Sequence, residues 1–152
     1  MFKLFNMSNV RDSLLQKLDE DFFLFLWSVK DSATKLFKPL GLRPEQAFII
    51  EMISRGQTHP KSISEVMQLE PSLLSHHLAK LEDAELIERE LDPEDRRRTR
   101  LRLTKKGEKL LARAREAWRL YTARVLSAFE PEELDTLMSF LQRLIQAQEV
   151  QR

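Results

Sequence analysis

Apolar residues recur at steps of three and four along most of the chain, which is the spacing of one face of an α-helix. The first such pattern runs from about Val10 to Phe37 and stops before Pro39 and Gly41, because both residue types end helices. A second pattern begins at Pro44 and ends at Gly56. Its middle is almost entirely apolar, so we expect this second helix to be buried.

Two shorter helical patterns follow, with a break at Glu70-Pro71 between them. Ser62 and Glu65 have the spacing of a capping box, in which each side chain bonds to the other residue's backbone amide, so we expect a helix to begin at Ser62. The next helix is predicted over 72–86. Two short helices joined by a tight turn are typical of a helix-turn-helix.

The period of the apolar residues changes after Leu86 from that of a helix to that of a strand. Apolar and charged residues alternate over 87–91 and again over 98–103, on either side of turn-forming residues at 92–95. This pattern predicts a β-hairpin with one apolar and one basic face. A hairpin that directly follows a helix-turn-helix is a wing, so we expect a winged helix.

Two further helical patterns complete the chain. Thr104 is a suitable N-cap for the first, whose apolar positions continue to Phe129, and Pro131 begins the second. The predicted fold class is therefore mainly α with a small β-hairpin wing. The terminal helices carry more apolar surface than a winged helix of this size needs to cover. We therefore expect a winged helix-turn-helix domain over 42–104, with dimerisation helices over 1–41 and 105–152.

The composition narrows the class of protein. A length of 152 residues suits one domain, or one domain with an oligomerisation element. The absence of cysteine excludes disulfides, thiol catalysis and cysteine-based zinc sites. No apolar run reaches about 18 residues, and the first residues lack the pattern of a signal peptide. We expect a cytoplasmic protein that does not enter a membrane.

The formal net charge of +1 hides an uneven distribution. Eight cations and one anion lie over 96–109, whereas eight anions and one cation lie over 82–95. Arg96 and Arg97 follow the predicted hairpin tip, where arginine can enter the minor groove of DNA. Further cations on the following strand, which could line up along phosphates, are Arg98, Arg100 and Arg102. The alternative is a solvated surface whose charge is partly neutralised across the hairpin by Glu88, Glu90 and Glu94.

The helix predicted from Ser72 is the candidate recognition helix. Short hydroxyl and imidazole side chains near a helix start can reach base edges or phosphates in the major groove. Candidates for DNA contact on the two short helices are Ser62, Ser72, Ser75, His76, His77 and Lys80. The alternative is the ordinary polar outer face of an amphipathic helix, although short side chains in place of glutamates favour DNA.

Metal binding and catalysis have little support in the sequence. His76 and His77 are adjacent, so on a helix they point about 100° apart and cannot chelate one ion together, and His59 lies in a predicted loop. No recognisable constellation of Ser, His and acidic residues and no phosphate-binding loop are present. We expect no metal, no cofactor, no catalytic residue and no enzyme activity.

Large apolar side chains on the first, second and fifth helices are candidates for lining a small-molecule pocket. These candidates are Phe23, Trp27, Phe48, Met52, Trp118 and Tyr121. The alternative for each of them is ordinary core packing. Trp27 and Trp118 are the most informative members, because each combines a large ring with a polar N–H.

As a set, these segments closely resemble the MarR family of bacterial transcriptional regulators. The most specific stretches are 81–89, Asp92-Pro-Glu-Asp-Arg-Arg97 at the wing and Leu103-Thr-Lys-Lys-Gly107 at the next helix. Pro71-Ser-Leu-Leu-Ser75 resembles the start of the family's recognition helix, and the helix starts at Pro44 and Pro131 also match. The resemblance covers nearly the whole chain.

The resemblance implies a homodimer on double-stranded DNA at a pseudopalindromic operator, with the first, fifth and sixth helices at the dimer interface. It implies that Arg97 enters the minor groove and that Asp95 holds it by a salt bridge. It also implies a repressor that is released by a small effector, which in this family is often aromatic or anionic. Two departures matter: His76 stands where many relatives carry arginine, and the lack of cysteine excludes the thiol-switched subgroup.

Two other functions remain open at this point. One is a dimeric winged-helix module that binds protein without specific DNA binding, and the other is a metal-responsive regulator. The run of cations at the wing favours DNA over a protein partner, because a protein-binding wing has little need of it.

Overall fold

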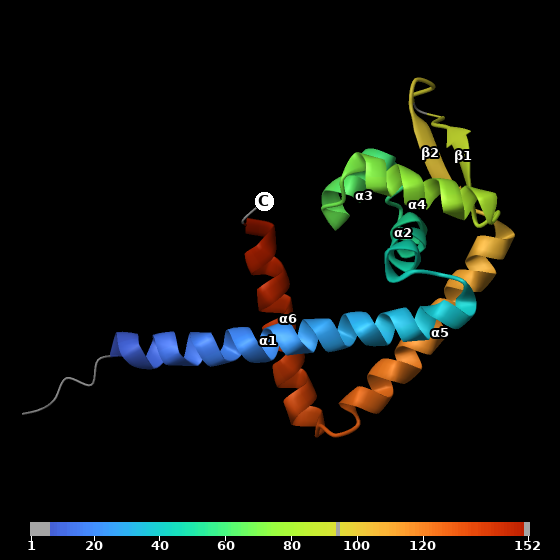
Figure 1. The fold of residues 1–152 in the computed structure, drawn as a ribbon. Coiled ribbons are helices and arrows are strands. Elements are labelled where there is room, and N and C mark those ends of the chain that lie inside the picture. Colours follow the sequence, from blue (N-terminus) through green and yellow to red (C-terminus); the bar gives the residue numbers. More distant parts are fainter. Residues whose placement is uncertain (1–6, 94, 151–152) are drawn as a thin grey trace, which may run out of the picture. The chain divides into compact units, whose positions relative to one another are not determined.

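Helices dominate the fold. The structure, a computed structural model, describes residues 7–93 and 95–150, and over these ranges it holds six α-helices, a short 3-10 helix and one antiparallel two-stranded sheet. The predicted class, mainly α with a small β-hairpin wing, is confirmed. In chain order the elements are α1 (Met7–Phe37), η1 (Lys38–Leu40), α2 (Pro44–Ser54), α3 (Pro60–Met67), α4 (Pro71–Asp83), β1 (Ile87–Leu91), β2 (Thr99–Leu103), α5 (Lys105–Leu126) and α6 (Pro131–Val150) (Figure 1).

The chain divides into two compact units, Met1–Ala114 and Arg115–Arg152. The first unit contains α1 to β2 and the beginning of α5, and the second contains the rest of α5 and α6. None of the helices over 7–93 and 95–150 combines the length and hydropathy of a membrane-spanning segment.

Prolines begin four of the helices, because a proline at the first helical position has the right φ and lacks an amide that would need a partner. One of them corrects a prediction: α3 begins at Pro60, so Ser62 is not its cap. Ser62 is half-buried within the first turn, and the N-cap residue is His59, whose carbonyl accepts the Ile63 amide at 3.1 Å.

The core of the first unit is built from α2, α3, α4 and the hairpin. Its most deeply buried large side chains are Ile49, Ile50, Ile63, Leu78, Leu81 and Leu101. The expectation that α2 is buried holds for Ala47, Ile49, Ile50 and Ile53, but it is wrong for Phe48, which is 59% exposed. Phe48 lies on the outer side of α2, away from the two isoleucines that follow it.

The tight turn of the predicted helix-turn-helix is present between α3 and α4. Gln68 ends α3 in the left-handed conformation, with φ at 51°, and the Ser64 hydroxyl donates to the Leu69 carbonyl at 2.6 Å. α4, the second helix of this motif, ends at Asp83, three residues before the end predicted from the sequence. Glu85 has a φ of 57°, which turns the chain so that the buried Leu86 leads into the hairpin.

The two strands of the hairpin pair in an unbroken register from Ile87 opposite Leu103 to Leu91 opposite Thr99. Ile87, Leu101 and Leu103 are buried on the inner face. The Leu101 amide also donates to the Thr58 carbonyl at 2.7 Å, which ties the hairpin to the loop between α2 and α3.

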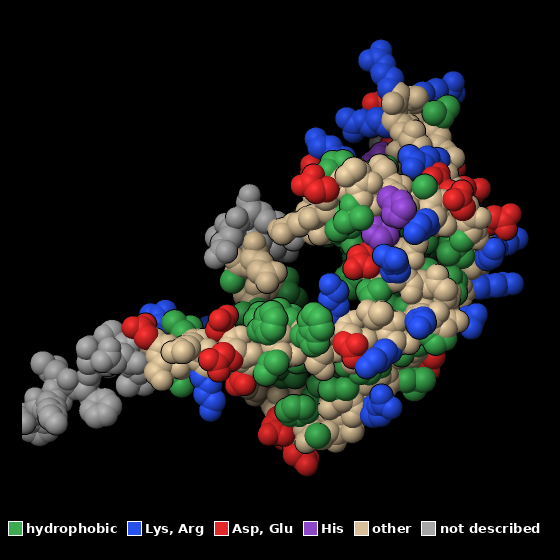
Figure 2. Space-filling model, in the orientation of Figure 1, with side chains coloured by type: hydrophobic (Ala, Val, Ile, Leu, Met, Phe, Trp, Pro, Cys, Tyr) green, Lys and Arg blue, Asp and Glu red, His purple; other side chains and the backbone are tan. Residues whose placement is uncertain are grey.

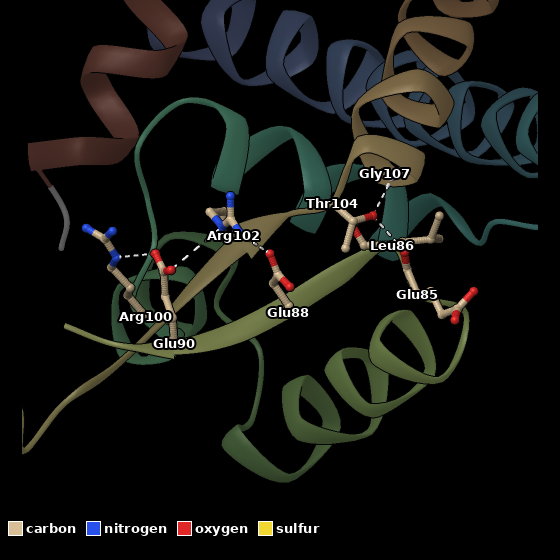
Figure 3. A network of polar contacts seen from close by, with 8 residues as sticks. All are labelled: Glu85, Leu86, Glu88, Glu90, Arg100, Arg102, Thr104 and Gly107. Carbon is tan, nitrogen blue, oxygen red and sulfur yellow. Dashed lines mark hydrogen bonds and ion pairs between the residues drawn. The ribbon is translucent and has the colours of Figure 1, made fainter. Parts of the chain in front are cut away.

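The predicted N-cap at Thr104 is confirmed. Its Oγ1 accepts the Gly107 amide at 3.0 Å and donates to the Glu85 carbonyl at 2.7 Å (Figure 3). One threonine therefore joins the end of the hairpin, the segment after α4 and the start of α5.

The second unit consists of helix and a short connection. α5 ends at Leu126, so Phe129 lies beyond the helix that was expected to include it. Before α6, the Glu133 carboxylate accepts the Glu130 amide at 2.9 Å. Apolar side chains of α6 that remain exposed are Met138, Phe140, Leu141, Leu144 and Ile145.

Candidate nucleic-acid interface

The outer face of α4 carries short and basic polar side chains. Ser72, Ser75, His76 and Lys80 are all exposed, as predicted for a helix that reads DNA. The inner face holds Leu74, Leu78 and Leu81. Ser62, the sixth candidate of this group, is half-buried on α3.

His77 is not on the outer face, so the prediction that it is available for DNA contact is wrong. It lies between Leu74 and Leu81 at helical spacing and is only 4% exposed. Its Nδ1 atom has no hydrogen-bond partner among the described residues. Burial lowers the pKa of His77 from the ordinary 6.5, against an opposing effect of the Glu45 carboxylate.

The solvent face of the hairpin is a ladder of ion pairs. Glu88 lies opposite Arg102, and Glu90 lies opposite Arg100. Arg100 Nε donates to Glu90 Oε1 at 2.6 Å, while Arg102 bonds to Glu88 and its Nε lies 3.7 Å from Glu90 Oε2 (Figure 3). All four side chains point to the same side of the two strands.

This ladder corrects the expectation of a basic hairpin face. Two carboxylates and two guanidinium groups carry no net charge together, so the expected partial neutralisation is confirmed for Glu88 and Glu90. Glu94, the third acid expected to take part, lies outside the described residues. The signal was present in the sequence, since acids and arginines alternate on both strands, but the pairing depends on the register.

The end of the hairpin is different from its strands. Arg96 and Arg97 are exposed and form no ion pair with any residue that the structure describes. Basic side chains project around the free end of the hairpin, at the top of Figure 2, and all basic residues over 91–99 are arginines. Positive charge that is available to an external anion is therefore concentrated at the tip.

Asp95 has a different guanidinium partner from the one expected. Its Oδ2 lies 3.3 Å from Nε of Arg98, while its Oδ1 accepts the backbone amide of Arg97 at 3.0 Å. The carboxylate thus orders the backbone at Arg97 and leaves that residue's side chain free. The expected salt bridge from Asp95 to the Arg97 side chain is wrong.

A second polar link holds the turn end of β1, and sequence reasoning missed it. His59 Nε2 lies 3.2 Å from the Oδ2 atom of Asp92, a residue that is only 9% exposed. Together with the bond from Leu101 to Thr58, this contact joins the hairpin to the segment that begins α3. No short-range pattern marks it, because 33 positions separate the two residues in the sequence.

The pocket candidates fall in both units. Phe23, Trp27 and Phe48 are exposed and Met52 is half-buried in the first unit. In the second unit the rings of Trp118 and Tyr121 lie 5.4 Å apart and both residues are half-buried. Over the described residues, no group of three or more His, Asp or Glu side chains is arranged to hold a metal ion.

Comparison with known proteins also finds a winged helix in this chain. Residues 42–107 match the family model of the winged helix DNA-binding domain. The chain is 28% identical over 117 residues to YkoM of Bacillus subtilis (strain 168), an uncharacterized HTH-type transcriptional regulator, and the match covers 76% of each protein.

Solved structures extend the similarity beyond the central domain. A MarR transcriptional regulator from Methanosarcina mazei Go1 superposes with a TM-score of 0.79 at 18% identity, over 90% of this chain and 99% of that one. The chain has the fold of the MarR family. A second MarR-type structure, MepR of S. aureus in complex with DNA, superposes with a TM-score of 0.70 at 21% identity, over 83% of this chain and 92% of that one. Within the MarR fold, α3 and α4 are the helix-turn-helix and β1 and β2 are the wing.

Proposed function

We propose that the chain is a transcriptional regulator that binds double-stranded DNA at specific sequences. The observation that supports this most directly is the pair Arg96 and Arg97, which are exposed and unpaired among the described residues at the end of a winged-helix hairpin. A hairpin tip is narrow enough to enter the minor groove, whose negative potential attracts arginine.

The exposed face of α4 suits the major groove. Ser72, Ser75, His76 and Lys80 would reach base edges and phosphates there, and the first amides of the helix favour a phosphate. His76 can accept or donate a hydrogen bond, unlike an arginine at the same position, so the base preference of this chain should differ from that of relatives with arginine there.

The protein acts as a homodimer in this proposal. Six consecutive apolar residues of α1, from Phe22 to Trp27, are all exposed in the single chain, and hydrophobic side chains are visible along this helix in Figure 2. Monomeric proteins rarely expose such a surface, and α6 exposes a second one. A symmetric dimer would place two α4 helices in successive major grooves about ten base pairs apart, on a pseudopalindromic operator.

The regulator would repress transcription until a small aromatic or anionic effector binds. The residues proposed to take part in effector binding are Phe23, Trp27, Phe48 and Met52 in the first unit and Trp118 and Tyr121 in the second. The ring pair of Trp118 and Tyr121 offers an apolar surface with polar atoms at its edge. Such an effector would act by favouring a conformation of the dimer that does not fit the operator.

A gel shift of the pure protein on DNA from its own upstream region, at two salt concentrations and with competitor duplex, tests the central proposal. A specific regulator gives a shift that resists competitor. A shift that competitor and salt both remove would show phosphate binding without sequence specificity. Absence of any shift would contradict DNA binding and would favour the protein-interaction function.

A further inference from the structure

The wing carries five arginines over 96–102, but the structure separates them into two groups. Arg96 and Arg97 at the tip have no ionic partner among the described residues, whereas Arg98, Arg100 and Arg102 each have a carboxylate. A count of cations in the sequence therefore overstates the charge that the wing offers to DNA.

The carboxylates of the strand ladder are shared, which couples the two arginines. Glu90 contacts Arg100 at 2.6 Å through Oε1 and Arg102 at 3.7 Å through Oε2, and Arg102 also bonds to Glu88 (Figure 3). The side chains of Glu90 and Arg100 are each about two-thirds buried, so this pair is better shielded from solvent than most surface pairs. If either arginine turned to a phosphate, it would leave a carboxylate facing the same polyanion.

We propose that Glu88 and Glu90 hold Arg100 and Arg102 away from the phosphates, so that only the tip of the wing contacts DNA. The two glutamates thereby weaken the binding that is independent of DNA sequence. The proposal rests on the DNA-binding function argued above. It removes Arg100 from the phosphate contacts that the sequence suggested, and it gives the two glutamates a role in specificity. Phosphate contacts raise affinity for all sequences alike, so fewer of them leave more of the binding energy to base contacts.

The dependence of binding on salt measures the number of neutralised phosphates directly. Each contact contributes about 0.9 to the slope of log K against log salt, so an added contact makes the loss of affinity between 50 and 200 mM salt about threefold larger. Fluorescence anisotropy on a labelled duplex of random sequence gives this slope for the full-length wild-type protein and for each variant.

Three variants separate the possible outcomes. Glu90→Gln frees Arg100, so the slope should steepen by about 0.9 for each wing that contacts the duplex, with tighter binding at low salt. The double variant Glu90→Gln with Arg100→Gln removes the pair without changing net charge and should keep the wild-type slope. Glu116→Gln changes net charge by the same amount and frees Arg119 from a comparable pair at 2.7 Å outside the winged helix, so it should also keep the wild-type slope.

The remaining results would overturn the proposal. An unchanged slope in Glu90→Gln would show that a freed Arg100 does not reach phosphate. A shallower slope in the double variant would show that Arg100 already contacts phosphate in the wild-type protein, and a steeper slope in Glu116→Gln would assign the effect to net charge. Wild-type protein that binds no duplex at any salt would instead refute the DNA-binding function and this inference with it. Thermal unfolding of each variant checks that the fold is retained.

Discussion

The backbone of Gly107 lies directly against the carbonyl oxygen of Leu86. A β-carbon at position 107 would come within 2.0 Å of that oxygen and 3.0 Å of the carbonyl carbon. Both obstacles are backbone atoms, which cannot rotate aside as a side chain can. The first turn of α5 and the segment that enters the wing therefore meet at a distance that only glycine permits.

Gly107→Ala should destabilise the protein by about 1–3 kcal/mol, because the added methyl group forces the two segments apart. This effect is opposite in sign to the usual one, because glycine to alanine inside a helix ordinarily stabilises a protein by up to about 1 kcal/mol. Urea unfolding followed by circular dichroism measures the change. Glu108→Ala, at the exposed next position, is the matched control and should have a small effect. A Gly107→Ala protein as stable as wild type would contradict the close contact.

His77 makes the stability of the winged helix depend on pH. Burial lowers its pKa in the folded state below the ordinary 6.5; Glu45 opposes this shift, and His76, Arg43 and Lys80 lower the pKa further. Above pH 6.5 the imidazole is neutral in the folded and in the unfolded state, so unfolding takes up no proton and the free energy of unfolding is at its highest. As the pH falls through 6.5, the unfolded chain takes up the proton first and the free energy of unfolding decreases, by at most about 1.4 kcal/mol per pH unit.

Removal of the imidazole should remove this dependence. His77→Leu fills the same buried position with an apolar side chain, so its unfolding free energy should decrease less than that of the wild-type protein between pH 7 and pH 5. Urea titrations at several pH values give both curves, and their difference isolates His77 from the carboxylates. Parallel curves would show that His77 does not stay neutral in the folded protein.

The tip of the wing should contribute directly to operator affinity. Arg97→Ala should weaken operator binding by at least about 1 kcal/mol, because it removes an exposed guanidinium with no partner inside the described chain. Arg119→Ala removes the same charge outside residues 42–107 and serves as the control. Anisotropy titrations on one operator duplex compare the two. Equal affinities for Arg97→Ala and wild type would refute the role given to the tip.

The apolar face of α6 should be required for dimer formation. Leu141 and Ile145 lie one helical turn apart and are both exposed, so glutamate at both positions would bury two charges in any interface that uses this face. Light scattering should then give a mass near 18.0 kDa in place of twice that value. Ser139→Glu, on another face of the helix, should leave the dimer intact. A double variant that remains dimeric would place the interface elsewhere.

The sequence predicts the elements well and the side-chain partners poorly, for physical reasons. Helix and strand periods depend on neighbours in the chain, so α4 and the hairpin could be located from Leu74, Leu78 and the alternation after Leu86. The buried position of His77 follows from the same period, since it lies three residues after Leu74, but a polar residue type suggested exposure.

Partners across the hairpin require the register, which a charge count does not contain. Glu90 meets Arg100 only because the turn has the length that places them opposite each other. The partner of Asp95 depends on the local conformation of that turn, which selected Arg98 over Arg97. The contact from His59 to Asp92 depends on tertiary packing alone, so it had no signal in the sequence.

The hydrogen bond from Leu101 to Thr58 makes the strands of the hairpin different from its turn. In the middle of β2, opposite Arg89, the Leu101 amide is directed to a partner in another segment, so its hydrogen exchange should be as slow as that of the domain core. At the tip, Arg96 and Arg97 have no such anchor and retain most of their rotamer freedom, which they lose only on ordering by a ligand. The wing therefore combines firmly held strands with a turn whose side chains can adapt to a ligand. The conformational entropy lost on binding is confined to a few residues of that turn.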